Sequence, residues 1–202
     1  MLQGDNNTRF HVGLRRRGRR LYRILPRYIR HDFVKTQRHT RQRKKTVYFE
    51  AAADYVSYGG ADYGAGIPGM IRQGGGIDLY PEISPYTFEV DPEDVAQRNP
   101  DVIIKGQPSG YFLTDTTQFQ QVYDSLISRA ELASTTAVTS NNVYVMSFDV
   151  AGGARKVFGP MFLAKILYPE LFTDFNPELV LQEYLETYLG LPWQGVYVYP
   201  GF

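Results

Sequence analysis

Thr46-Val47-Tyr48-Phe49-Glu50 is the stretch that decides the fold of this chain. A run of β-branched and aromatic residues of this length predicts a short buried strand. It stands where the composition changes, because residues 1–45 are dominated by arginine and the residues after them are not. A folded domain, residues 46–202, is therefore expected to begin here.

Two more buried strands are predicted further along, at Asp101–Lys105 and Asn142–Ser147. Residues 51–76 contain eight glycines and predict mostly loop, with one short helix at about residues 69–73. Capping residues and apolar runs predict the remaining helices at 92–98, from Thr114 or Asp115 to about 129, at 161–167 and at 177–188. Strands alternating with helices predict an α/β fold, a three-layer Rossmann-like domain around a mainly parallel sheet.

Charge divides the chain into two segments. Residues 1–45 hold 15 of the 22 Lys and Arg residues with only Asp5 and Asp32 as acids, so they carry +13, and the remainder carries −12. Apolar residues from Leu21 to Ile29 follow helical spacing, interrupted by Pro26, so this segment is expected to be a basic helix or unstructured.

Several functional classes are excluded or disfavoured. The chain has no cysteine, which excludes disulfides, thiolate metal sites and a cysteine nucleophile. No apolar run approaches the length needed to span a bilayer, and the Arg-rich start lacks the apolar core of a secretory signal. Hydrolase, nucleotide-binding and zinc-protease motifs are absent, and all three histidines lie before residue 46, so we expect no catalysis, no cofactor and no metal site.

A set of ordered motifs points to one family. They are Val47-Tyr48-Phe49-Glu50 with Asp54-Tyr55, Gly74-Gly75-Gly76-Ile77-Asp78, Asp91-Pro92-Glu93-Asp94-Val95, Asn99-Pro100-Asp101-Val102-Ile103-Ile104, Asn142-Val143-Tyr144-Val145, Leu163-Ala164-Lys165 with Tyr168-Pro169-Glu170, and Val196-Tyr197-Val198-Tyr199-Pro200. In order and spacing they resemble the C-terminal lobe of the iron-siderophore and cobalamin class of ABC-transporter substrate-binding proteins, above all its archaeal branch. That family has two α/β lobes joined by a rigid helix.

The resemblance implies a solute-binding component of an ABC importer that works outside the cytoplasm. Its ligand would be an iron chelate such as a siderophore or haem, or a corrinoid. In the family an N-terminal lobe precedes the Val47–Glu50 strand, whereas here 45 Arg-rich residues do. Either another polypeptide supplies that lobe, or the first segment is not native to the family.

Candidate ligand contacts lie on the loops after the predicted strands, where α/β proteins bind ligands. Tyrosine suits a flat chelate, because its ring supplies apolar area and its hydroxyl a hydrogen bond. The alternative is that the tyrosine rings pack the loops onto the domain and that Arg155 is a solvated surface residue. The candidates are Tyr55, Tyr58, Tyr80, Tyr86, Tyr111, Asp149 and Arg155.

Partner surfaces are suggested at two places. The resemblance implies that Glu93, in the first turn of a predicted helix, pairs with arginines of the ABC permease. Alternatively Glu93 only complements the helix dipole. The basic segment supports a rival function, binding of nucleic acid or an anionic surface.

Overall fold

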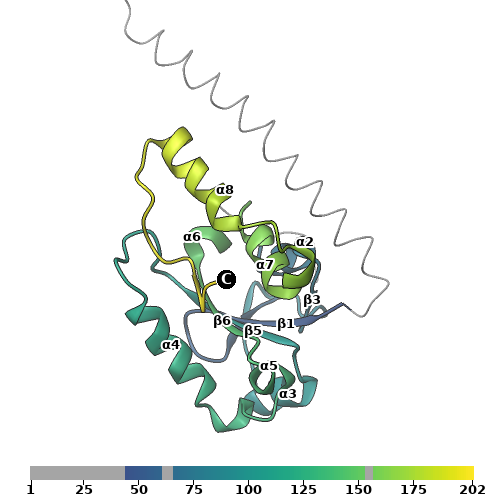
Figure 1. Ribbon diagram of the computed structural model, residues 1–202. Helices are drawn as coiled ribbons and strands as arrows, with labels where there is room; N and C mark the ends of the chain where they lie inside the picture. The colour runs from purple at the N-terminus through teal and green to yellow at the C-terminus, as the bar shows by residue number, and fades with distance from the viewer. Residues whose placement is uncertain (1–43, 61–65, 153–156) are drawn as a thin grey trace, which may run out of the picture.

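The computed structural model describes residues 44–60, 66–152 and 157–202, and its central feature is one mixed sheet (Figure 1). The strand order is β4-β2-β1-β5-β6-β7, with β3 pairing β1 beside β2. The strands are β1 (Thr46–Glu50), β2 (Val56–Tyr58), β3 (Ile77–Asp78), β4 (Thr87–Glu89), β5 (Val102–Gln107), β6 (Val143–Ser147) and β7 (Val198–Tyr199).

The centre of the sheet is parallel. Strand β1 pairs in parallel with β5 and with β3, and β5 pairs in parallel with β6. Strands β2, β4 and β7 add antiparallel pairs toward the edges. The three buried strands and the α/β class predicted from the sequence are confirmed.

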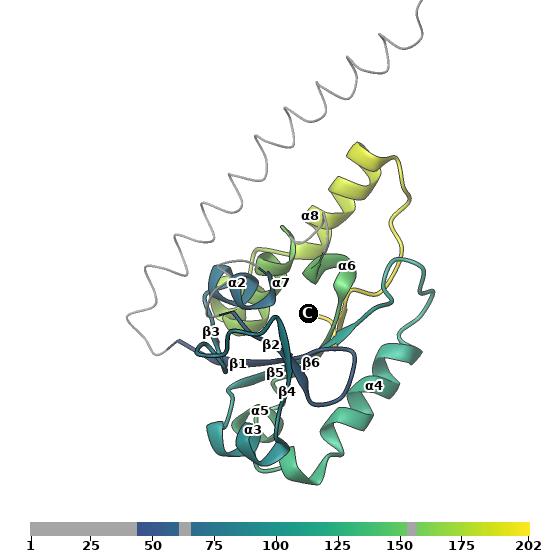
Figure 2. The same ribbon diagram turned by 180° about the vertical axis from the view of Figure 1, so that it is seen from behind.

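Helices cover both faces of the sheet, and Figure 2 shows the same layers from behind. Helices α2 and α7 lie on one face, and α3, α4 and α5 on the other (Figures 1 and 2). The helical elements are α2 (Gly66–Gln73), α3 (Pro92–Arg98), α4 (Thr117–Ile127), η1 (Ala130–Leu132), α5 (Thr136–Thr139), α6 (Phe148–Ala151), α7 (Gly159–Leu167), η3 (Pro169–Leu171), α8 (Pro177–Glu183) and the π-helical η4 (Tyr184–Leu189).

Each face of the sheet has its own hydrophobic core. Val47 and Phe49 of β1 point into the core under α2 and α7, and the intervening Tyr48 points into the core under α3 and α4. This follows from the two-residue period of a strand. All three side chains are buried, as a strand between two helical layers requires.

Capping residues explain where the helices begin. Asp91 accepts a hydrogen bond from the backbone N–H of Glu93 at 2.9 Å, and Pro92 opens α3 at the predicted residue. Asn176 caps α8 in the same way, through the N–H of Glu178 at 2.8 Å. Asp115, one of the two predicted caps with Thr114, accepts a hydrogen bond from the N–H of Thr117, the first residue of α4.

The region predicted as mostly loop, residues 51–76, holds more structure than expected. It contains β2 and the eight-residue helix α2, which starts at Gly66 rather than near residue 69. Strand β2 is only three residues long and is followed at once by Gly59 and Gly60, so its alternation of apolar and polar residues is too short to predict a strand. The basic segment falls almost wholly outside the described residues, so its expected helix is neither supported nor opposed here.

The connections reverse direction between β1 and β5. From β1 the chain passes through α2 to β3 on one side, then returns through α3 to β5 on the other side and through α4 to β6. In open α/β sheets this topological switch point, at the carboxyl ends of the strands, is the usual place for a ligand site.

Candidate functional site

A network of charged side chains lies at the switch point, on the face covered by α4. Glu50 ends β1, and Lys105 is its partner across the parallel pair with β5. Asp54 and Tyr55 lie in the loop between β1 and β2, and Arg129 comes from the turn after α4. The ionic network, as we call Glu50, Asp54, Lys105 and Arg129, thus joins three segments that are distant in sequence.

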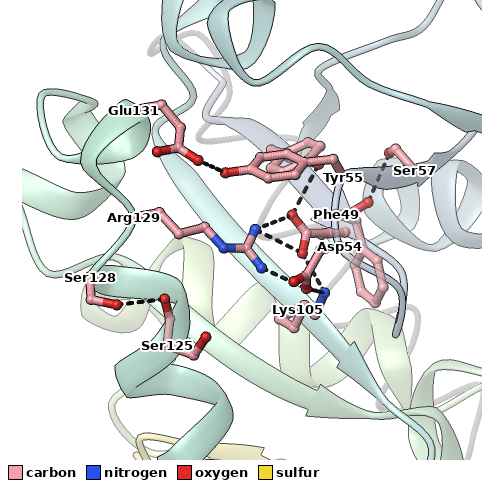
Figure 3. A network of polar contacts seen from close by, with 11 residues as sticks. Phe49, Asp54, Tyr55, Ser57, Lys105, Ser125, Ser128, Arg129 and Glu131 are labelled. Carbon is pink, nitrogen blue, oxygen red and sulfur yellow. Dashed lines mark hydrogen bonds and ion pairs between the residues drawn. The ribbon is translucent and has the colours of Figure 1, made fainter.

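Each cation in the ionic network contacts both acids, and Figure 3 shows the contacts of Lys105 and Arg129 with Asp54. Lys105 Nζ donates to Glu50 Oε1 and, at 2.7 Å, to Asp54 Oδ1. Arg129 donates from Nη1 to both Glu50 oxygens at 3.1 and 2.8 Å, and from Nη2 to Asp54 Oδ1 at 2.6 Å. Tyr48 adds a hydroxyl donor to Glu50 Oε2 at 3.2 Å. Because every buried charge is paired, the network avoids the large cost of an isolated ion.

The loop carrying Asp54 is held by further contacts from the same turn. The guanidinium carbon of Arg129 lies 4.7 Å from the centre of the Tyr55 ring, and the Tyr55 hydroxyl donates to Glu131. Tyr55 adopts a left-handed backbone with φ of 52°, which is unfavourable for an aromatic residue. Burial and the bond to Glu131 raise the pKa of Tyr55 to about 12. Arg129 and Glu131 thus fix a strained loop conformation.

On the opposite face, aromatic rings gather at the same end of β1. Tyr58 contacts Phe49, Tyr86 and Phe148 edge-on, with ring centres 6.1, 5.7 and 6.4 Å apart. Tyr86 is 64% exposed, whereas Phe49 is buried. These four residues form the aromatic cluster, which carries no charge and presents Tyr86 and part of Tyr58 to solvent.

Asp149 has a positional role in the structure. Its Oδ2 accepts a hydrogen bond from the backbone N–H of Tyr111 at 2.8 Å. A Cβ on the neighbouring Gly110 would lie 2.6 Å from that oxygen, so only glycine allows this close approach. Tyr111 is buried, and its hydroxyl donates to the Pro192 carbonyl at 3.2 Å. The contact fastens the loop after β5 to the start of α6.

The structure therefore brings together only some of the predicted ligand residues. Tyr58 and Tyr86 are in contact, and Tyr55 lies on the opposite face of the sheet. Tyr80 is buried there too, against Tyr48, with Arg98 4.4 Å above its ring. Arg155 lies outside the described residues. Glu93 is exposed in the first turn of α3, as predicted.

Sequence reasoning overlooked Glu50, Lys105 and Arg129 as site residues. Glu50 and Lys105 are the last residues of two predicted buried strands. An unpaired charge is costly at such a position, so the sequence indicated that each needs a partner of opposite charge. Arg129 gave no comparable signal, because an arginine near a helix end is usually solvated. Only the tertiary fold brings it to Glu50, 79 residues away.

Neither a metal centre nor a membrane span is found in the described part of the chain. Among residues 44–60, 66–152 and 157–202, no group of three or more His, Asp or Glu side chains is arranged to hold a metal ion. No helix in these ranges has the length and apolar character needed to cross a bilayer.

Comparison of the sequence with protein families gives a match to the periplasmic binding protein family over residues 11–150. The chain belongs to this family. Members are solute-binding proteins of the ABC-transporter type, which work with permease subunits. The match includes residues 11–45, so the boundary at residue 46 stays a prediction. A comparison with curated proteins finds no match.

Solved structures of periplasmic binding proteins share the fold. The TroA-like protein FepB from Veillonella parvula superposes with a TM-score of 0.75 at 19% identity, over 86% of this chain and 53% of its own. MolA from Haemophilus influenzae, solved with molybdate, gives 0.67 at 18% identity over 88% and 52%. A Saccharomonospora viridis structure described as an Fe³⁺-hydroxamate transport system gives 0.54 at 18% identity over 70% and 47%. The chain thus spans about half the length of these structures.

Proposed function

We propose that this chain is the C-terminal lobe of the solute-binding component of an ABC importer for an iron chelate or a corrinoid, acting outside the cytoplasm. The observation that carries the proposal is the partly exposed aromatic cluster at the carboxyl end of β1, the switch point of the sheet, in a chain of the periplasmic binding protein family. The Fe³⁺-hydroxamate description of one structural neighbour supports an iron chelate as the ligand.

The partly exposed pair Tyr58 and Tyr86 is proposed to contact the ligand. Two edge-on rings offer an apolar surface with hydroxyl groups at its border, which suits a flat or macrocyclic chelate. A second lobe would close the opposite side of the ligand. One lobe alone leaves the ligand largely in water, so its affinity is expected to be weak.

Titration of the chain with a ferric hydroxamate, haem and cobalamin, followed by tyrosine fluorescence and by calorimetry, tests this proposal. We expect one of the three to bind with a Kd in the high micromolar range. Tyr58→Ala or Tyr86→Ala should weaken that binding about three- to tenfold, whereas Tyr123→Phe, remote from the cluster, should not. Submicromolar binding would contradict the one-sided site, and binding that is equally strong in all variants would contradict the assigned residues.

Docking to the permease is proposed to involve Glu93. Its carboxylate is exposed in the first turn of α3, and its own backbone N–H is already satisfied by Asp91. Glu93→Gln should leave the melting temperature unchanged but weaken capture by the solubilised cognate permease, and Glu93→Arg should abolish capture because like charges at an interface repel. If the permease captures both variants as well as the parent, Glu93 does not take part in docking and only complements the helix dipole.

A second candidate function is supported by the charge of +13 in residues 1–45. Such a segment would bind phosphates of nucleic acid or of an anionic surface without sequence preference. Titration with labelled nucleic acid at two salt concentrations separates the functions. Tight binding that weakens steeply with salt favours the second function, and weak binding at both concentrations favours solute transport.

A further inference from the structure

Asp54 differs from the other members of the ionic network in its exposure. The side chains of Glu50, Lys105 and Arg129 are 0%, 5% and 11% exposed, whereas that of Asp54 is 65% exposed. Three of the four charges are thus fixed inside the domain, and only the fourth comes from a surface loop. The buried part alone contains two cations and one acid, so it requires one more negative charge from the solvent side.

Both buried cations point at the same oxygen of Asp54. Lys105 Nζ lies 2.7 Å and Arg129 Nη2 lies 2.6 Å from Asp54 Oδ1. A carboxylate oxygen between an ammonium and a guanidinium group has the geometry of a bound oxyanion. The hydrogen bond from Lys105 is the main cause that lowers the pKa of Asp54, so this position favours a negative oxygen.

The loop that provides this oxygen is a simple hairpin turn. Ala52 and Ala53 precede Asp54 and are exposed, and the turn is closed by a backbone hydrogen bond from Ala51 to Val56 at 2.7 Å. A rotation of the Asp54 side chain into water would therefore free the two cations without disturbing β1, β5 or α4.

We propose that Lys105 and Arg129 form an oxyanion-binding site at the switch point, and that Asp54 occupies it as an internal ligand that an external carboxylate or phosphate replaces. The site lies on the face of the sheet opposite the aromatic cluster and does not depend on chelate binding. Its ligand chemistry is one negatively charged oxygen shared by an ammonium and a guanidinium group.

The test is rescue of Asp54→Ala in the full chain by small oxyanions. Thermal melts are recorded in formate and in inorganic phosphate, each against sodium chloride at the same ionic strength. At an oxyanion concentration five times its Kd, the melting temperature of Asp54→Ala should rise by about 2 to 4 °C. Formate acting alone would identify a carboxylate site, and phosphate acting alone a site for tetrahedral oxyanions.

Two control variants separate this site from general salt effects. Glu131→Ala removes a neighbouring exposed acid that bonds Tyr55 rather than either cation, so it should show no rescue. Asp54→Ala combined with Lys105→Met should lose the response. If Asp54→Ala gives no cooperative melt, Asp54→Ser is measured instead under the same criteria. A response to both oxyanions no larger than that of Glu131→Ala overturns the proposal.

Discussion

At the carboxyl end of β1, the two faces of the sheet carry opposite chemistry. Phe49 points to one face and meets Tyr58 and Phe148 in the aromatic cluster, and Glu50 points to the other and meets Lys105 and Arg129. The two residues are adjacent in sequence, and the two-residue period of the strand turns their side chains to opposite faces. The aromatic face is stabilised by apolar area, whereas the ionic face is stable only while every charge has its partner.

The largest expected effect follows from removing one buried cation. Lys105→Met leaves Glu50 buried beside a single cation, Arg129, and breaking a buried ion pair costs several kcal/mol. We expect the free energy of unfolding to fall by about 3 kcal/mol, measured by urea denaturation.

Two further variants test whether this loss comes from the uncompensated charge. Adding Glu50→Gln to Lys105→Met should cost less than the sum of the single changes, because the unpaired acid is then gone. Glu183→Gln, on the exposed surface of α8, should have no effect. A loss below about 1 kcal/mol in Lys105→Met would show that the network behaves like a surface ion pair.

The aromatic face should respond to added volume instead. A Cβ on Gly106 would lie 2.4 Å from the ring of Phe148, which also packs against Phe49 and Tyr58. Gly106→Ala is expected to lower the free energy of unfolding by about 2 kcal/mol. Gly201→Ala, where nothing lies within 4 Å of the added Cβ, is the control for a glycine-to-alanine change that meets no neighbour and should be neutral. Equal stability of both variants would mean that the cluster repacks freely.

A buried acid in β3 provides the contrast to Glu50. Asp78 is 5% exposed, its Oδ2 has no hydrogen-bond partner, and burial raises its pKa to about 6. Because the folded-state pKa exceeds the unfolded value, Asp78 favours folding in its neutral form. Its contribution to stability is therefore fully present below about pH 4 and is lost as the pH rises through about 6.

Asp78→Asn should thus raise the free energy of unfolding at pH 7.5 by about 1 to 2 kcal/mol and change it little at pH 4. Urea denaturation at the two pH values measures the difference. A variant that is destabilised to the same extent at both would indicate that Asp78 is ionised and satisfied in the folded protein.

The smallest effect is expected from deleting residues 1–44. Every residue named in the two faces follows Thr46, so we predict that a chain starting at Lys45 is soluble and melts cooperatively within about 3 °C of the full chain. Differential scanning calorimetry of both chains measures this. Loss of the cooperative transition would assign the basic segment to the folded core.

The sequence by itself determined the class of the fold and the position of its main elements. The predicted strands Thr46–Glu50, Asp101–Lys105 and Asn142–Ser147 correspond to β1, β5 and β6, because their β-branched and aromatic residues suit a sheet covered on both faces. Asp91 with Pro92, and Asn176 with Pro177, marked the starts of α3 and α8 because capping is a local interaction. The ordered motifs also led to the family.

Only the tertiary structure decided which residues come together at the candidate site. Tyr80 and Tyr111 belong to predicted ligand loops but are buried by neighbours from other segments, and such burial is not a local property. Arg129 follows α4, which packs on β5 and β6, and this packing brings the turn after α4 to Glu50. No spacing in the sequence encodes that contact. Strand periodicity turns Phe49 and Glu50 to opposite faces of the sheet, but the packing of the helices decides which side chains they contact there.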